Sequence, residues 1–384
     1  MSPESEDLDL AAETVRRFGE HVQAVLFSGD APDGNLDAVP DLIAEAAGMD
    51  ILADAGPLRA GHEIGVWGRH ILREGCRLSL LTLSMLGEVC AGLATAVHAQ
   101  GIGALALDGS ECVPSGATVG AGFLPAFGLA LDRRTAPDVL HIERDAGGKH
   151  LKGRAHFILA SGRPDWLVCF ARDEGANGWA ALAIPASGRG INLEQVGSRL
   201  GLRAVSQWHV TCERASVADE WVLVEGSDAS GLLSRVMACD WLGQAAIALG
   251  AARRAVHDAR DYAGGRYQGG RMIIEHAAIR LLLAQAEHDT ALLASVLDEH
   301  ADRPLDSQRP EDLLRWAIGA RLAVGEHAQR AVTNCLQVFG GYGYMDDYGL
   351  SKRLRDVGVL ASLHGGPDQL LLLLEDMASP GGDR

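Results

Sequence analysis

The apolar residues of this 384-residue chain change their spacing twice. They recur every three to four residues over 1–107, fall into short alternating runs over 108–225, and return to the helical spacing over 226–384. The first spacing indicates amphipathic helices, and the alternating one indicates half-buried strands. The sequence therefore predicts an α+β protein, mainly α, with an N-terminal helical domain, a middle antiparallel β-domain and a C-terminal helical bundle domain.

In the first region, helices are expected from Leu10 to Val25, over 42–47 and over 64–72. A single long apolar helix is expected over 78–97. Segments that contain glycine and proline, such as 30–34, separate these helices.

The middle region contains short β-type runs between turn residues. The runs at 139–142 and 155–159 flank Gly147 and Gly148, which predicts a hairpin. Further runs begin at three tryptophans, Trp166, Trp179 and Trp208. We expect a small antiparallel sheet or barrel.

In the third region, helices are expected over 234–263, 271–300 and 310–337, all rich in alanine and leucine. They are hydrophobic on more than one side. Such helices are typical of the centre of a bundle or of a subunit interface.

Composition limits the classes of partner. The formal net charge of −17 argues against nucleic acid or an anionic membrane surface. The seven cysteines are dispersed and include no CxxC, which indicates free thiols in a reducing compartment and no metal site. The acidic start, MSPESEDLDL, does not resemble a signal peptide. A cytoplasmic protein is expected.

The segment 336–356 reads LQVFGGYGYMDDYGLSKRLRD. Paired glycines at the end of a helix allow φ > 0 and let another group approach the main chain. With the basic residues over 352–355 behind it, this break could hold an anionic ligand. It could equally be a plain helix C-terminus with its tyrosines packed in the core.

The pattern Gln337-x-x-Gly340-Gly341-Tyr342-Gly343-Tyr344, followed by Arg355-Asp356, resembles a signature near the C-terminus of the acyl-CoA dehydrogenase family. A second segment, Tyr262-Ala263-x-x-Arg266-x-x-x-Gly270, is similar to the family's arginine segment. The resemblance covers essentially the whole chain and implies the helix–sheet–helix fold with a four-helix bundle as its last domain.

The same resemblance implies an FAD cofactor. It assigns Arg266, Gln337, Gly340 and Gly341 to the residues that one subunit offers to a neighbour's FAD. A homo-oligomer (dimer or tetramer) or a hetero-oligomer with a related dehydrogenase subunit is therefore expected. The implied partners are an acyl-CoA or carrier-protein thioester and an acceptor of the electron-transfer flavoprotein type.

The family's reaction removes a proton α to a thioester while a hydride leaves the β carbon for flavin N5, so a base is needed. The position of the family's usual glutamate is occupied by His364, which could be a base, polar lining or a subunit contact. Some members place the base on the first long C-terminal helix, at a position that falls on or next to Asp240. Asp240 is thus a candidate base or a helix cap. The candidate catalytic residues are Asp240 and His364.

Two segments depart from the family pattern. The expected flavin loop falls near 127–134, where FGLALDRR does not resemble it, and the strand that touches the flavin ring corresponds to 157–159. Three hypotheses follow. The chain could be an FAD-dependent acyl-CoA dehydrogenase-like oxidoreductase that desaturates an acyl thioester. It could be a catalytically degenerate subunit that contributes to a partner's FAD site. It could also be a flavin-independent thioester enzyme or binding protein.

Overall fold

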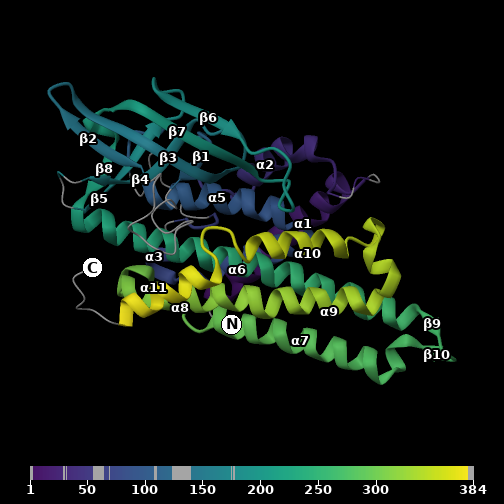
Figure 1. The fold of residues 1–384 in the computed structure, drawn as a ribbon. Coiled ribbons are helices and arrows are strands. Elements are labelled where there is room, and N and C mark those ends of the chain that lie inside the picture. The colour runs from purple at the N-terminus through teal and green to yellow at the C-terminus, as the bar shows by residue number, and fades with distance from the viewer. Residues whose placement is uncertain are drawn as a thin grey trace.

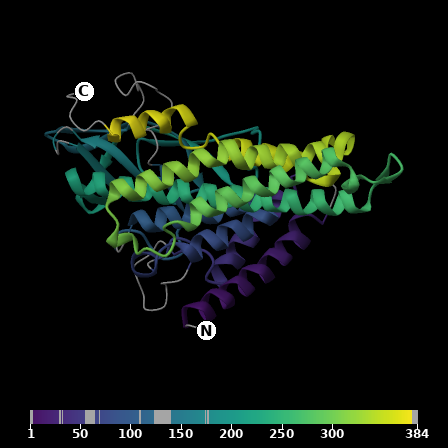
Figure 2. The same ribbon diagram turned by 90° about the horizontal axis from the view of Figure 1, so that it is seen from below.

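The computed structural model describes residues 3–28, 31, 33–54, 65–68, 70–107, 110–122, 140–173, 175 and 178–378. A mixed sheet lies against helices from both ends of the chain, and the C-terminal helices run side by side beneath it (Figures 1 and 2). This arrangement confirms the predicted fold class. The N-terminal helices are α1 (Pro3–Leu26), α2 (Val39–Gly48), α3 (Ile71–Glu74), α4 (Arg77–Val89) and α5 (Ala91–Leu107).

Two helix predictions in this region were wrong. The long helix expected over 78–97 is divided into α4 and α5, because Cys90 adopts an extended backbone conformation. The start of α5 sits against the loop before β7, where a Cβ on Gly92 would lie 3.0 Å from the backbone nitrogen of Ala204. Apolar periodicity cannot reveal such a change of direction, because both helices are apolar. The helix expected over 64–72 is a turn at 65–68 followed by the short α3.

The middle region forms an eight-stranded sheet in the order β6-β7-β3-β1-β4-β5-β8, with β2 beside β3 and β4. The strands are β1 (Val119–Gly122), β2 (His141–Asp145), β3 (Gly148–Ala160), β4 (Trp166–Asp173), β5 (Gly178–Pro185), β6 (Ile191–Gln195), β7 (Ser206–Val217) and β8 (Val222–Glu225). The hairpin expected at Gly147 and Gly148 joins β2 to β3. The sheet is not purely antiparallel as predicted, since β1 runs parallel to β4 with Ala121 opposite Val168. Alternation of side chains fixes the face of a strand but not the direction of its neighbour.

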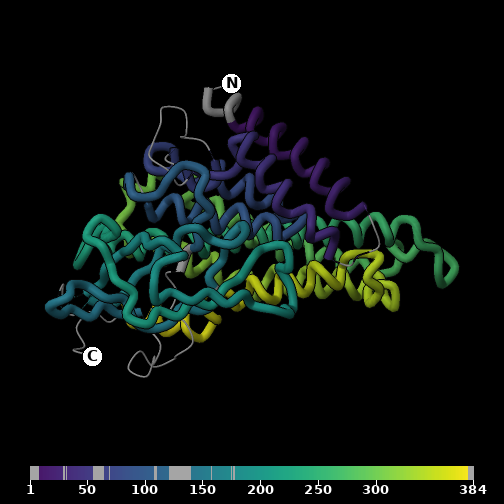
Figure 3. Tube along the Cα trace, turned by 90° about the horizontal axis from the view of Figure 1, so that it is seen from above, coloured from purple at the N-terminus to yellow at the C-terminus, as the bar shows by residue number. Residues whose placement is uncertain are grey.

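The C-terminal bundle is built around α6 (Gly226–Gly265), which packs against α4, α5, α7, α8, α9 and α10. The other helices are α7 (Ala277–Asp298), α8 (Pro310–Ala323), α9 (Gln329–Phe339), α10 (Leu350–Leu360) and α11 (Pro367–Ala378), with a π-helical turn at Val324–Ala328 between α8 and α9. A hairpin of β9 (Tyr267–Gln268) and β10 (Arg271–Met272) follows α6. It protrudes at one end of the molecule, and the sheet lies at the other (Figure 3).

Helix α6 is long and apolar enough to cross a membrane by length and composition alone. However, 83% of its most apolar 18-residue window is buried inside the protein. This burial is what the core helix of a bundle requires, so the composition of α6 follows from its neighbours.

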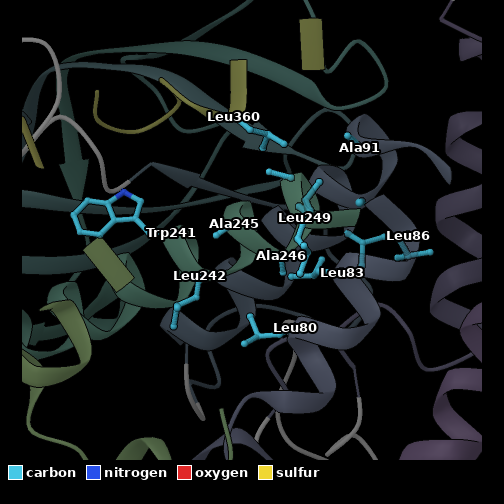
Figure 4. Packing of buried hydrophobic residues seen from close by; sticks show 14 of the residues in the cluster. Leu80, Leu83, Leu86, Ala91, Trp241, Leu242, Ala245, Ala246, Leu249 and Leu360 are labelled. Carbon is cyan, nitrogen blue, oxygen red and sulfur yellow. The ribbon is translucent and has the colours of Figure 1, made fainter. Parts of the chain in front are cut away.

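Glycines allow α4 and α6 to approach closely. A Cβ on Gly250 of α6 would overlap the carbonyl oxygen of Ser84, and one on Gly87 of α4 would overlap that of Ile247. Around this contact, Leu83 of α4 lies against apolar side chains of α6 that include Ala246 (Figure 4). The shared core of the N-terminal and C-terminal regions depends on this approach.

We expect Gly250→Ala to lower the free energy of unfolding by about 1–3 kcal/mol, because the added methyl group must push two backbones apart. Gly231→Ala is the matched control on the same helix, since a Cβ there meets nothing within 4 Å. The control should raise the free energy of unfolding by about 0.5–1 kcal/mol through helix propensity. Urea unfolding followed by circular dichroism measures both changes, and equal effects of the two substitutions would contradict the packing argument.

Candidate active site and cofactor pocket

A pocket of about 790 Å³ lies at the end of the bundle, between the C-terminal end of α6, the β9–β10 hairpin and the break after α9. Its lining contains Arg266, Gln337, Gly340 and Gly341. The structure thus brings together the four residues that the sequence suggested for cofactor binding, from two segments about seventy positions apart in the chain.

The main chain at the break is open to a ligand. Helix α9 ends because Gly340 takes φ +58°, which favours glycine. A Cβ on Gly340 or Gly341 would meet no atom within 4 Å, so nothing in the described chain covers their backbone. Gly343 differs, because a Cβ there would lie 2.5 Å from the Leu336 carbonyl oxygen. The first two glycines therefore leave space for a ligand, whereas Gly343 is required by packing.

Arg266 supplies a cation at the pocket wall. Its guanidinium carbon lies 5.3 Å from the ring centre of Tyr342. Its Nε atom is buried and has no hydrogen-bond partner in the part of the chain that the structure describes. Such a donor is satisfied when an acceptor such as a phosphate oxygen binds.

Aromatic side chains form the rest of the wall. Tyr262 stacks on Phe339 with ring centres 4.2 Å apart, and Tyr348 packs edge-on against both. Tyr344, beside the pocket, is 84% exposed. A group that carries both an aromatic ring and phosphates, such as FAD, fits this combination of stacking surface, bare backbone and cation.

The second site is a buried network around Asp240, whose side chain is only 2% exposed. His98 Nε2 lies 3.0 Å from Asp240 Oδ1. His364 Nδ1 lies 2.7 Å from Oδ2, and Gln244 Nε2 donates to the same oxygen at 2.6 Å. The two candidate catalytic residues are therefore in direct contact.

The partners of His98 define its protonation. The Trp67 indole donates to His98 Nδ1 at 2.7 Å, so that nitrogen is an acceptor. His98 Nε2 consequently carries the hydrogen and donates it to Asp240. A Cβ on Gly243 would overlap the His98 ring, so a glycine at this position of α6 lets the imidazole approach the helix.

Arg321 is the buried cation of the network. Its Nε donates to Gln244 Oε1 at 3.1 Å, which orients the Gln244 amide with its nitrogen toward Asp240. Burial lowers the pKa of Arg321 to about 10, an effect that the charge of Asp240 opposes. Burial alone would raise the pKa of Asp240, but the charge and hydrogen bond of His364, together with His98, lower it well below its usual range. The network holds a carboxylate and a guanidinium linked through one amide.

The backbone of His364 is held in an uncommon conformation. Its φ is +59°, in the left-handed region that non-glycine residues seldom adopt. The Trp241 indole donates to the His364 carbonyl at 3.0 Å, and Arg321 Nη2 donates to the Leu363 carbonyl at 3.0 Å. Strain of this kind marks a candidate functional residue.

Helix capping by Asp240 was one of two interpretations of its sequence position. Helix α6 begins at Gly226, fourteen residues earlier (240 − 226), so Asp240 lies inside the helix and that interpretation was wrong.

The sequence analysis missed Trp67, His98, Gln244 and Arg321 as members of the network. The sequence contained one signal for them. His98 and Gln244 are polar residues inside runs that are otherwise apolar, which indicates burial with a partner. It does not indicate which partner.

The basic residues over 352–355 have structural partners. Lys352 donates to Asp356 at 2.6 Å, and Asp356 also accepts the Leu202 backbone N–H at 2.6 Å. Arg355 pairs with Asp33 at 3.0 Å. These contacts hold α10 against the loop before β7 and against Asp33. Lys352 and Arg355 are therefore engaged within the protein, and we do not assign an anionic ligand to them.

The flavin loop expected near 127–134 lies outside the described residues. The segment 157–159 lies in β3, but the side chain of Phe157 is outside the described part of the chain. Among the residues that are described, no cluster of three or more histidine, cysteine, aspartate or glutamate side chains could hold a metal ion.

The model of the acyl-CoA dehydrogenase C-terminal domain matches residues 238–376. An arylacrylate reductase, 3-(aryl)acrylate reductase of Clostridium sporogenes, is 30% identical over 226 residues, which is 56% of this chain and 57% of that protein. An acyl-CoA dehydrogenase of Bacillus subtilis is 28% identical over 61% of this chain and 62% of its own length. The aligned regions thus span about three fifths of these relatives.

Butyryl-CoA dehydrogenase of Megasphaera elsdenii has the same fold, with a TM-score of 0.76 at 18% identity over 98% of both chains. The fold is that of an acyl-CoA dehydrogenase, with its helical, β and helical regions in the same order. Residues 238–376 thus match the acyl-CoA dehydrogenase C-terminal domain, and the whole chain has the acyl-CoA dehydrogenase fold.

We expect Asp240→Asn to lower the free energy of unfolding at pH 7 by about 3–5 kcal/mol, because it leaves the buried guanidinium of Arg321 without its opposite charge. The folded-state pKa of Asp240 lies below its unfolded value, so the carboxylate stabilises the fold above the unfolded pKa and loses this contribution as pH falls. The difference between wild type and variant should therefore narrow below about pH 5.

Urea unfolding at a series of pH values tests this expectation. Asp9→Asn on the exposed face of α1 is the control and should leave stability unchanged. A difference for Asp240→Asn that stays constant down to pH 3 would mean that the carboxyl has the same pKa in the folded and unfolded protein, and a difference that widens would mean that the carboxyl is protonated in the folded protein.

Proposed function

We propose that this chain is an FAD-dependent oxidoreductase that introduces an α,β double bond into an acyl thioester. The observation that carries the proposal is the open pocket that Arg266, Gln337, Gly340 and Gly341 line together. The match of residues 238–376 to the acyl-CoA dehydrogenase C-terminal domain, and relatives that are named as a dehydrogenase and a reductase, support the class of reaction. The acyl group would arrive as a CoA or carrier-protein thioester, and electrons would pass on to an acceptor of the electron-transfer flavoprotein type.

The pocket residues would hold the adenosine diphosphate part of FAD. Arg266 would donate to a phosphate oxygen, the backbone of Gly340 and Gly341 would lie against the ligand, and Gln337 would bind its polar edge. FAD, when bound, supplies the acceptor for the hydride that leaves the β carbon of the substrate.

The two sites on one chain are far apart. Asp240 and Gly265, the residue before Arg266, are 25 positions apart on one helix (265 − 240). At the rise of an α-helix this is about 38 Å, which is longer than an FAD molecule. An FAD bound at Arg266 of one copy would therefore serve the buried network of another, which requires an oligomer.

Asp240 and His364 would handle the substrate proton. A proton at the carbon α to a thioester needs a base held in a dry site, and the carboxylate and imidazole are in contact in the interior of the protein. Arg321 and Gln244 hold this pair by hydrogen bonds, so little reorganisation is needed when charge moves.

In a second candidate function, this chain is a subunit whose pocket helps to bind the FAD of a partner chain. Its own Asp240 and His364 would then take no part in catalysis. The pocket lies at the outer end of the bundle, and Tyr344 and Tyr267 beside it are 84% and 64% exposed. This position favours contact with another chain, whether that chain is a copy or a related subunit.

The first test is the visible spectrum of the purified chain, with released flavin measured per subunit. We expect flavin in the wild-type protein and a fall of tenfold or more in FAD affinity for Arg266→Gln, because one charged phosphate contact is worth about 1.5–3 kcal/mol. Arg16→Gln, an exposed arginine on α1, is the control and should bind FAD as the wild type does. A protein that stays colourless with added FAD would contradict the first function and favour the second.

The second test separates a shared site from a self-contained one. His364→Asn and Arg266→Gln chains are each purified, and are also co-expressed. In a symmetric dimer that shares its sites, half of the co-expressed dimers are mixed and each has one intact site, so about a quarter of wild-type activity should return. No activity above that of the separate variants would show that each chain uses its own Arg266.

A further inference from the structure

We propose that a second pocket, next to the cofactor pocket, binds a carboxylic acid that carries one negative charge and an apolar body. This pocket has a volume of about 640 Å³ and lies between α1, the junction of α4 and α5, α6 and the start of α10. Helix α10 packs beside α6 (Figure 1). The proposal does not depend on the proposed function, because it uses neither flavin nor the buried network around Asp240.

The group that would bind the carboxylate is Arg353, whose hydrogen bonding is incomplete. Its Nη2 atom pairs with Asp258 Oδ2 at 3.2 Å. Its Nη1 atom is buried and has no hydrogen-bond partner among the residues that the structure describes. The other basic residues of the run 352–355, Lys352 and Arg355, have carboxylate partners. A buried N–H donor without an acceptor costs free energy, and an oxygen of a bound anion removes that cost.

The N-terminus of α10 lies at the same pocket. Gly349, Lys352 and Arg353, at the start of this eleven-residue helix, are part of the lining. Gly349 takes φ +67°, and no side chain caps the helix. A Cβ on Gly349 would lie 3.0 Å from Arg353 Nη1, so a side chain there would crowd the guanidinium. The dipole and free N–H groups of a helix N-terminus favour an anion, and here they act together with a cation.

The ion pairs in the lining leave one positive charge uncompensated. Asp258 is shared by two guanidinium groups, since Arg254 Nε donates to it at 2.8 Å. Lys352 donates to Asp356 at 2.6 Å, and that pair is balanced. Burial lowers the pKa of Arg353, against the effect of the Asp258 charge, so its positive charge is poorly solvated. One negative charge on a ligand would complete the balance.

The outer part of the pocket limits how much negative charge a ligand can carry. Three exposed aspartates also belong to the lining, namely Asp261, Asp346 and Asp347. Solvent screens their repulsion of a single charge, but the repulsion grows with each further charge on the ligand. The pocket should therefore prefer a carboxylate to a doubly charged phosphate.

The rest of the lining includes apolar and aromatic side chains, namely Phe27, Val89, Tyr262, Phe339 and Tyr348. The last three also line the cofactor pocket, so the two pockets share an aromatic wall. Their unpaired cations differ, because Arg353 lines this pocket and Arg266 lines the other. An aromatic or hydrocarbon body would lie against the rings while its carboxylate contacts Arg353.

The first experiment compares three probes on the purified full chain. Phenylacetate carries one negative charge, phenylacetamide is its neutral counterpart, and phenyl phosphate carries two charges at pH 8. Binding is measured by calorimetric titration at pH 8 with an excess of FAD present. We expect saturable binding of phenylacetate and an affinity for phenylacetamide that is tenfold lower or more, because the amide lacks the charge that Arg353 requires. Phenyl phosphate should bind more weakly than phenylacetate.

Each other result of the probe comparison would overturn the proposal. Without saturable binding of phenylacetate, the pocket holds only water. Equal affinities for the acid and the amide would mean that Arg353 does not select charge. Tighter binding of phenyl phosphate would contradict the assignment to carboxylates. This comparison uses the wild-type protein, so it does not depend on the stability of a variant.

The second experiment locates the bound probe. Arg353→Met should lower the affinity for phenylacetate tenfold or more, and the fold should persist because Asp258 keeps its hydrogen bond from Arg254. Arg260→Gln is the matched control, since Arg260 of α6 contacts Glu287 and does not line the pocket. The control should bind phenylacetate as the wild type does.

Arg266→Gln distinguishes the two pockets. It alters the cofactor pocket, so it should weaken FAD binding and leave phenylacetate binding unchanged. An unchanged affinity for phenylacetate in Arg353→Met would overturn the proposal. A loss of phenylacetate binding in Arg266→Gln would place the probe in the cofactor pocket and would overturn the proposal as well.

Discussion

The fold depends on the burial of one carboxylate in the middle of its central helix. An ionised aspartate inside a core costs several kcal/mol unless hydrogen bonds and an opposite charge compensate for it. The hydrogen bonds to Asp240 come from His98 of α5, Gln244 of α6 and His364 in the loop after α10. The opposite charge is the guanidinium of Arg321 on α8, which is linked to Asp240 through Gln244. Elements far apart in the chain must therefore meet at this point of α6.

Small residues on α6 make that meeting possible. Gly250 lets the backbone of α4 touch α6, and Gly243 makes room for the His98 imidazole of α5. Helix α6 is buried among apolar side chains on almost every side, yet the missing side chain of Gly243 leaves space for the polar imidazole ring of His98. Gly250 determines how α6 packs on α4, and Gly243 determines where the His98 imidazole lies. Because both are on one helix, a change at either glycine would disturb both the packing and the buried network.

The predictable part of this protein was local. Helical and β spacings predicted the three regions, and the resemblance to acyl-CoA dehydrogenases at Arg266 and Gln337 implied a cofactor site, whose residues lie together in one pocket. Contacts between distant segments were not predictable. His98 and Gln244 are polar residues in apolar runs, which indicates burial, but their meeting with Asp240 and Arg321 depends on how α5, α6 and α8 cross. The break at Cys90 and the parallel pairing of β1 with β4 depend on tertiary contacts in the same way.

In the proposed function, His364 stands where the resemblance to acyl-CoA dehydrogenases places a glutamate base, so its chemistry depends on the neighbouring Asp240. A lone carboxylate in a dry pocket is a stronger base because burial raises its pKa. A lone imidazole in the same place would become a weaker base, because burial disfavours its charged form. The imidazole of His364 is not alone, because its Nδ1 atom lies 2.7 Å from the Asp240 carboxylate. The two positions at which the resemblance places a base are therefore in direct contact here, and His364 and His98 lower the pKa of the Asp240 carboxyl against the effect of its burial.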